Sequence, residues 1–333
     1  MILVTGCAGF IGSHLCEKLI ALKHDVIGVD NFDAYYSWQL KKKNLAPLLP
    51  KRGFKFIRAD VTDERKVKQI FARQQISMVV HLAARPGVSA SIKHPLIYEK
   101  INVLGTLTLL KQLRGRQTYF ILGSSSSVYG GVKKLPYTED MKLPAPISPY
   151  GASKLTAEFY TRFFHQTYQI PSTILRFFTV YGPRVRPDMA IFKFIRLIKN
   201  NQAVVLYNRG VVKRDFTYID DIIEGIMKVI EIKPKFNIIN LGNHKAVSVT
   251  EVVKDLARIM NKRVKIKSAP LPVGEMPATW ADINQATKIL KWRPQVSLET
   301  GLSKTVEWFM KEKATAKFSP PTRKPMGSKP KDE

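Results

Sequence analysis

The first 180 residues alternate short, continuously apolar runs with segments of helical periodicity, and this alternation constrains the fold more than any other feature. Uninterrupted apolar strands separated by helices are typical of parallel βαβ units whose sheet is covered on both faces. We predict helices near residues 11–23, 63–74, 94–113 and 148–169, and strands at "MILVTG", "DVIGVD", "FKFIRAD", "MVVHLAA", "TYFILGSS" and "STILRFF". The sequence therefore predicts an α/β fold with a doubly wound parallel sheet over residues 1–180.

The rhythm changes after residue 180. Pro183 and Pro187 lie in a long irregular stretch, "YGPRVRPD", and shorter elements follow it. We predict helices near 189–200, 220–232, 249–261 and 298–312 and strands at "AVVLY" and "FNIINL". These elements indicate a smaller mixed α/β lobe over residues 181–312, partly interwoven with the first domain. Residues 313–333 are rich in proline, lysine and serine without periodicity, which predicts a disordered basic tail.

A glycine-rich segment, "TGCAGFIG" at residues 5–12, follows the first predicted strand and opens the first predicted helix. Glycine permits a tight turn and a close approach of the backbone to a pyrophosphate, and the helix N-terminus supplies free N–H groups. Asp30 ends the second strand, where a carboxylate accepts hydrogen bonds from the adenosine ribose and repels a 2′-phosphate. Asp60, after the third strand, could reach the adenine amine. The pattern predicts a dinucleotide site that favours NAD over NADP.

The segment "SPYGASK" at residues 148–154 sets Tyr150 and Lys154 one helical turn apart. A tyrosine hydroxyl has an ordinary pKa near ~10, so it needs help to act as a base at neutral pH. The Lys154 ammonium and an oxidised nicotinamide ring would both stabilise the phenolate and lower that pKa. Ser125, in "GSSSSVYGG" at the end of the fifth strand, is placed to hydrogen-bond a substrate oxygen beside Tyr150.

With these motifs together, the chain resembles the extended short-chain dehydrogenase/reductase family over roughly residues 1–312. The likeness is carried by "TGCAGFIG", Asp30, "HLAA", "SSSSVYG", "YGASK" and "RDFTYIDD". It implies a Rossmann domain that binds NAD, a C-terminal lobe that binds a nucleotide sugar, and Ser125, Tyr150 and Lys154 as the catalytic set. The cofactor-binding residues that it implies are Gly6, Gly9, Phe10, Ile11, Gly12, Asp30, Asn31, Asp60, Val61, Leu82, Ala83, Ala84, Asn102, Tyr150, Lys154 and Phe177.

Within that family the sequence is most similar to nucleotide-sugar 4-epimerases, and especially to UDP-glucuronate 4-epimerases, through "SSSSVYGG", "FFTVYGPRVRPDMAIFKF" and "PATWAD". Related dehydratases carry Asp-Glu before "VYG" and decarboxylases carry Glu there, whereas this chain has Ser126 and Ser127. Short hydroxyl groups suit a role in pinning the sugar carboxylate. The resemblance implies substrate contacts from Arg85, Ser125, Ser126, Ser127, Thr179, Arg186, Lys193 and Arg214, with Arg214 on the diphosphate.

Two departures from the epimerase pattern leave alternatives open. Ser89 stands where an arginine is typical, with Arg85 nearby, and Asn208 and Arg209 replace a Gly-Asp pattern. Another nucleotide-sugar epimerase of the UDP-glucose/galactose type, or a dehydratase or decarboxylase, remains an alternative. A non-enzymatic NAD-sensing protein is a further alternative, although such a protein has no need for the complete catalytic set.

The net charge is +28, from 54 basic and 26 acidic side chains. The basic residues are spread along the chain without a nucleic-acid-binding signature, so we expect a basic surface and no nucleic-acid partner. No apolar run approaches the ~18 residues of a membrane span. The strand "MILVTG" begins at once, and only Cys7 and Cys16 are present, so we expect a cytoplasmic protein without disulfides or metal. Apolar residues on several faces of helices near 94–113 and 148–169 lead us to expect a homodimer.

Overall fold

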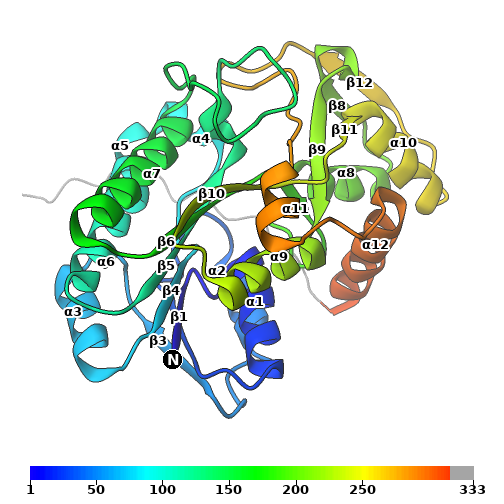
Figure 1. The fold of residues 1–333 in the computed structure, drawn as a ribbon. Coiled ribbons are helices and arrows are strands. Elements are labelled where there is room, and N and C mark those ends of the chain that lie inside the picture. The colour runs from blue at the N-terminus through cyan, green and yellow to red at the C-terminus, as the bar shows by residue number, and fades with distance from the viewer. Residues whose placement is uncertain (316–333) are drawn as a thin grey trace, which may run out of the picture.

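The computed structural model describes the backbone of residues 1–315 and the side chains of residues 1–312. Its centre is a sheet of seven parallel strands in the order β10-β6-β5-β4-β1-β2-β3 (Figure 1). The predicted doubly wound fold is confirmed, and its order reverses between β1 and β4, where open α/β sheets bind ligands. The strands are β1 (Ile2–Thr5), β2 (Val26–Asp30), β3 (Phe54–Arg58), β4 (Met78–His81), β5 (Tyr119–Ser125), β6 (Ser172–Phe177) and β10 (Phe236–Leu241).

Helices cover both faces of this sheet (Figure 1), and each face has its own apolar core. One face packs against α3 (Glu64–Arg73), α6 (Gly105–Leu113) and α7 (Pro149–Tyr168), which bury Phe71, Leu110 and Phe164. The other face packs against α1 (Phe10–Ala21), α9 (Ile219–Ile232) and α11 (Asn284–Leu290). Burial on both sides explains why the strands are apolar without alternation.

The predicted helix near 94–113 is three consecutive segments in the structure. It consists of α5 (Pro95–Tyr98), a π-helical segment η1 (Glu99–Leu104) and α6. Short elements that the sequence did not signal are α2 (Trp38–Leu45), α4 (Val88–Lys93), η2 (Ser126–Tyr129) and η3 (Asn208–Gly210). Periodicity is weak in elements of this length, so they emerge only from tertiary packing.

Two small sheets build the lobe that follows residue 178. One has the order β11-β9-β7 and the other pairs β12 with β8. Their strands are β7 (Thr179–Tyr181), β8 (Val204–Tyr207), β9 (Lys213–Tyr218), β11 (Ala246–Ser248) and β12 (Ile266–Ala269). The remaining helices are α8 (Ala190–Lys199), α10 (Val249–Ile259) and α12 (Leu298–Thr315). The domain boundary at residue 180 stays a prediction, and β10 of the second segment is an edge strand of the central sheet.

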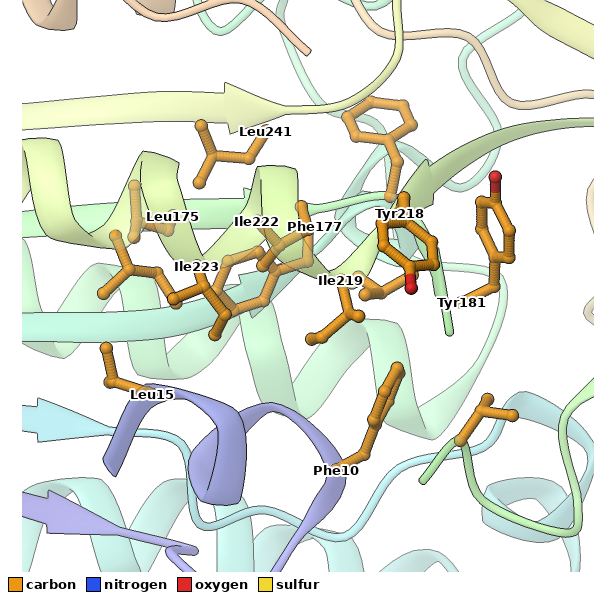
Figure 2. Close-up of a cluster of buried hydrophobic side chains, with 14 of the residues drawn as sticks. Phe10, Leu15, Leu175, Phe177, Tyr181, Tyr218, Ile219, Ile222, Ile223 and Leu241 are labelled. Carbon is orange, nitrogen blue, oxygen red and sulfur yellow. The ribbon is translucent and has the colours of Figure 1, made fainter. Parts of the chain in front are cut away.

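An apolar joint connects the lobe to the central sheet. Figure 2 shows Phe10 and Leu15 of α1 below the row of Ile219, Ile222 and Ile223 on α9. Leu175 and Phe177 of β6, Leu241 of β10, and Tyr181 and Tyr218 of the small sheet lie in the same cluster. This continuous core fixes the lobe beside the glycine-rich segment.

Within residues 1–315, the structure contains no helix that is both long and apolar enough to cross a membrane. The predicted disordered tail lies mostly outside the described residues: α12 extends to Thr315, and residues 316–333 lie beyond it.

Candidate active site

The glycine-rich segment forms the turn between β1 and α1. Gly6 has φ +73°, and a Cβ placed there would lie 2.8 Å from the backbone nitrogen of Ala83. A Cβ at Gly12 would collide with the carbonyl oxygen of Gly6. The first turn of α1 contains no acidic residue of its own. The segment thus leaves a backbone cradle at a helix N-terminus that fits a diphosphate.

A cavity of about 200 Å³ lies at the carboxyl ends of the central strands, beside this cradle. The donor set around it fits a dinucleotide, with the glycine segment at its centre, carboxylates at one end, and a tyrosine and a lysine at the other. The predicted residues that line it are Gly6, Gly9, Phe10, Ile11, Gly12, Asp30, Asn31, Asp60, Val61, Leu82, Ala83, Ala84, Arg85, Tyr150, Lys154, Phe177 and Arg186.

Asp30 is buried at the end of β2 with its carboxylate held by the backbone. Oδ1 accepts from the Phe32 N–H at 2.8 Å and Oδ2 from the Ala8 N–H at 3.2 Å. Burial raises the pKa of Asp30, and the Lys41 ammonium, 3.8 Å away and also buried, opposes that rise. Lys41 lines the cavity, and the sequence analysis missed it. Lys41 is one of three successive lysines at 41–43, and no sequence pattern shows which of them is buried. The packing of α2 decides it.

Asp60 lies beside Asn31 at the same end of the cavity. Its Oδ2 accepts from Asn31 Nδ2 at 2.8 Å, and its Oδ1 accepts from the Thr62 N–H and hydroxyl at 2.8 and 2.7 Å. Burial opposes ionisation, but hydrogen bonds from Thr62 and Asn31 outweigh it and hold the pKa of Asp60 below its usual range. The carboxylate is therefore a fixed acceptor.

The predicted catalytic helix α7 begins with a defined cap. Pro149 occupies its first turn, and the Ser148 hydroxyl accepts from the Gly151 N–H at 3.1 Å. The cap places Tyr150 in the first turn and Lys154 one turn later, both on the cavity side. Lys154 Nζ donates to the carbonyl of Gly123 at the end of β5, at 2.8 Å. The tyrosine and the lysine thus share one wall of the cavity.

The protonation of these two groups is set mainly by burial. Burial raises the pKa of Tyr150, while a hydrogen bond with Ser125 and the Arg186 charge lower it. Burial lowers the pKa of Lys154 to about 8, and the Glu158 carboxylate opposes that fall. In this structure, Ser125 and Arg186 are the groups that counteract the rise in the pKa of Tyr150. The sequence had predicted that Lys154 would lower this pKa.

Three neighbouring hydroxyl groups follow β5 beside Tyr150. Ser125 Oγ donates to Ser127 Oγ at 3.1 Å and accepts from the Ser127 N–H at 3.1 Å, which caps η2. Ser126 is buried in the same turn. No carboxylate stands at these positions, so this wall offers hydroxyl donors and acceptors only.

Three loops meet at the mouth of the cavity through charged side chains. Arg85 pairs with Asp33 at 3.0 Å, and Arg186 pairs with Asp188 at 3.0 Å. The Tyr35 hydroxyl donates to Asp188 at 3.1 Å, and the Arg85 guanidinium lies 5.1 Å from the centre of the Tyr35 ring. The sequence analysis named both arginines and missed Asp33, Tyr35 and Asp188, whose loop positions show no periodic signal.

Several predicted residues lie outside the cavity lining. Asn102, in η1, donates to Ser153 Oγ at 2.9 Å and accepts from the Arg85 N–H at 2.7 Å. Arg214, on β9, forms an ion pair with Glu275 at 3.1 Å. The remaining ones are Ser125, Ser126 and Ser127 on the adjacent wall, half-buried Thr179 on β7 and exposed Lys193 on α8. The roles of all these side chains stay predictions.

Comparison with known proteins identifies relatives that cover nearly the whole chain. The family model described as GDP-mannose 4,6 dehydratase matches residues 3–305. A UDP-glucuronate 4-epimerase from Thermodesulfobacterium geofontis is 41% identical over 309 residues, which cover 92% of this chain and 95% of that protein. The chain belongs to the extended short-chain dehydrogenase/reductase family.

Solved structures of this family have the same fold. A UDP-glucuronic acid 4-epimerase from Bacillus cereus, in complex with UDP-glucuronic acid and NAD, gives a TM-score of 0.88 at 37% identity. The match covers 93% of this chain and 99% of that one. A UDP-glucose 4-epimerase from Thermotoga maritima with UDP-glucose gives a TM-score of 0.86 at 33% identity, with the same coverage. The predicted family membership is confirmed.

Proposed function

We propose that this chain catalyses NAD-dependent C4 epimerisation of a UDP-sugar, converting UDP-glucuronate into UDP-galacturonate. The observation that carries the proposal is that Tyr150 and Lys154 line the cavity beside the glycine-rich segment, with the hydroxyl groups of residues 125–127 on the adjacent wall. Family members named as UDP-glucuronate 4-epimerases, one of them solved with UDP-glucuronic acid and NAD, support this choice.

Residues that line the cavity would hold the cofactor. The glycine segment and the N-terminus of α1 bind the diphosphate, Asp30 accepts from the adenosine ribose, and Asp60 lies at the adenine. Bound NAD would supply the hydride acceptor for oxidation at C4 and the hydride donor for the return step. Such a cycle would consume no net cofactor, and we therefore expect NAD to copurify with the protein or to bind tightly.

The proton at the C4 hydroxyl is handled by Tyr150. Tyr150 would accept this proton in its phenolate form while C4 becomes a ketone, and Ser125 would hydrogen-bond the same oxygen. Because burial raises the pKa of Tyr150, the phenolate needs the positive charge of the oxidised nicotinamide ring beside it. The flat 4-keto sugar then turns over about its diphosphate link and is reduced on its opposite face, and Tyr150 returns the proton. The lobe must therefore hold the nucleotide firmly, through Arg214 and Lys193, and the sugar weakly.

A uronate adds a requirement, because its 4-keto form is a β-keto acid that loses CO₂ when the carboxylate bond aligns with the ketone. Ser126, Ser127 and Thr179 would hydrogen-bond the carboxylate and keep it out of that alignment, with Arg186 adding charge near Tyr150. Related dehydratases and decarboxylases carry acidic residues at these positions for the later proton transfers. Serines occupy those positions here, which favours epimerisation.

We further infer that two copies associate through α7 and η1. Phe159 and Phe163 on α7 are 62% and 50% exposed, and Leu104 at the end of η1 is 46% exposed. Such large apolar side chains on neighbouring helices suit a two-fold interface in which the same surface meets itself. Light scattering at micromolar concentration should give twice the chain mass, and a monomeric mass would contradict this assembly.

The experiment that tests the proposal is a product assay. Incubation with UDP-glucuronate should yield UDP-galacturonate of unchanged mass, resolved from the substrate by the NMR coupling at C4. Loss of water or of CO₂ would identify a dehydratase or decarboxylase, and turnover of UDP-glucose alone would move the assignment to the UDP-glucose/galactose type. Binding of NAD without conversion of any of these sugars would favour an NAD-sensing protein. The expected cytoplasmic location remains a prediction.

A further inference from the structure

A row of polar side chains crosses the central sheet directly behind the predicted catalytic residues. Ser124 on β5 stands opposite Arg176 on β6, and Arg176 stands opposite Asn240 on β10. Residues opposite one another in a parallel sheet point to the same face, so the three side chains form one transverse line. All three are buried, and a polar row within an apolar sheet needs specific partners.

Glu158 on α7 is the partner that fills this row. Its carboxylate accepts from Arg176 Nη2 at 2.7 Å and from Arg176 Nε at 3.0 Å, and it accepts a short hydrogen bond from the Ser124 hydroxyl. Arg176 Nη1 donates to the Tyr129 hydroxyl at 2.9 Å, which donates to Asn240 at 2.8 Å. Glu158 is thus fixed from two strands.

Glu158 also continues the spacing of the catalytic set on α7. Tyr150, Lys154 and Glu158 follow one another at four-residue intervals, so they share one helix face. Three consecutive positions of β5 hold them: Ser125 bonds Tyr150, the Gly123 carbonyl accepts from Lys154, and Ser124 bonds Glu158. The end of β5 and one face of α7 therefore form a single matched unit.

Among the residues whose side chains the structure describes, Glu158 supplies the carboxylate charge that acts on Lys154. Lys154 is fully buried, and from β4 it faces His81, whose pKa burial lowers to about 3, so that ring is neutral. Tyr150 lies on the same face, and Arg176 faces Glu158 from β6. Beyond Arg176 stand Tyr129 in η2 and Glu139 in the loop before α7.

We propose that Glu158 is a positioning residue that acts on Lys154 through its charge: held by Ser124 and Arg176 one helical turn from Lys154, its carboxylate keeps the Lys154 ammonium charged during turnover. The proposal rests on the proposed function for its meaning in catalysis. Under this proposal the Glu158–Arg176 pair serves the active site as well as the fold. Stability alone does not explain the pair, because burying two charges costs about as much free energy as their attraction returns. A merely structural pair would leave the pH dependence of the active site unchanged.

The test replaces Glu158 by glutamine, which keeps the shape and removes the charge. Without that charge the ammonium loses its proton at lower pH, so activity is lost earlier as the pH rises. We expect the alkaline limb of kcat/KM to move by about one pH unit toward acid, a typical effect of losing a nearby opposite charge. The matched control is Glu64→Gln on α3, where Glu64 forms an exposed ion pair with Lys111 of α6. This change should leave the pH profile unchanged.

A second readout needs no sugar. NAD affinity, followed by quenching of tryptophan fluorescence, should fall as Lys154 deprotonates, and in Glu158→Gln that fall should shift by the same amount. Lys154→Met should abolish this pH dependence, which shows that the readout reports Lys154. If NAD titrations shift as expected but no sugar is epimerised, the proposed function fails and the inference about Glu158 stands.

Folding is controlled by a double variant. Glu158→Gln alone leaves Arg176 buried without its counter-charge, whereas Glu158→Gln with Arg176→Gln removes both charges and keeps hydrogen-bonding groups in the row. The double variant should fold and show a smaller acid shift than Glu158→Gln, because loss of the Arg176 charge offsets part of the loss of the Glu158 charge. Glu158→Asp should restore part of the original profile. Folded variants whose alkaline limb and NAD titration coincide with those of the parent would overturn the proposal.

Discussion

The inner wall and the mouth of the active site are built differently. On the inner wall, Tyr150, Lys154 and Ser125 are held by a helix cap, a strand carbonyl and hydrogen bonds of buried groups. At the mouth, Arg85 and Arg186 reach the cavity from loops, and their partners Asp33 and Asp188 are themselves about one-third exposed.

This difference separates two requirements of a single reaction. Proton and hydride transfer need fixed geometry, which buried hydrogen bonds and strand register supply. A sugar that must turn over between two half-reactions needs contacts that can be exchanged, and partly exposed ion pairs on loops are weaker than fully buried ones. We therefore expect substitutions on the inner wall to lower kcat and substitutions at the mouth to change KM or the product.

The largest effect should come from Tyr150→Phe. This change removes the proton acceptor while leaving the ring in place, so kcat should fall by at least ~10²-fold with little change in NAD affinity. Rates from the NMR product assay and NAD binding by fluorescence measure the two separately. A fully active variant would remove the proposed base.

Asp30→Ala should weaken NAD binding by about 1–3 kcal/mol, the range for a lost charge-assisted hydrogen bond. The change also leaves Lys41, 3.8 Å from the lost carboxylate, without its partner in the ribose end of the cavity. NADP affinity should consequently rise relative to that of the parent, because an anion is no longer repelled. Calorimetric titration with both cofactors checks this, and equal affinity of the parent for NADP would contradict the role of Asp30.

Thr179→Ala should change the product more than the rate. With one carboxylate contact removed, part of the 4-keto intermediate should lose CO₂ and appear as a UDP-pentose, detected by mass spectrometry. Ser172→Ala, at a buried serine near the far end of β6, is a matched loss of one hydroxyl group that should form no pentose. Absence of pentose from Thr179→Ala would remove its carboxylate role and leave epimerisation intact.

The smallest effect should come from Asp33→Ala at the mouth. The Arg85–Asp33 pair is partly exposed, and such pairs are worth about 0–1 kcal/mol. We expect KM for the sugar to change less than about fivefold and kcat to stay unchanged, with the effect weakening in high salt. A large loss of kcat would show that the mouth also positions the reacting atoms.

The inner wall was largely readable from the sequence, for physical reasons. Three local patterns carried the prediction: glycines at a strand-to-helix turn, an acid at a strand end, and Tyr-x-x-x-Lys in a helix that starts with a serine cap and a proline. Their geometry follows from short-range rules. Six strands of the central sheet were predicted from their apolar runs, whereas β10 was recognised as a strand but placed in the C-terminal lobe. These features depend little on distant parts of the chain.

The remaining features depend on contacts between distant segments. Lys41 is one of three successive lysines, and only the packing of α2 turns it toward Asp30. The mouth joins loops after β2, β4 and β7, and the Glu158 row needs the register of β5 against β6. Arg214 pairs with Glu275, 61 residues along the chain, a contact that no local pattern signals.

The central claim is that C4 is oxidised and reduced again within one site, with the same hydride returning to the same sugar. Turnover of UDP-glucuronate carrying deuterium at C4 in ordinary water tests this directly. The account predicts UDP-galacturonate that retains the C4 deuterium, read by NMR and mass spectrometry, with no added cofactor consumed. Replacement of that deuterium by solvent hydrogen, or the absence of any C4 epimer, would contradict it.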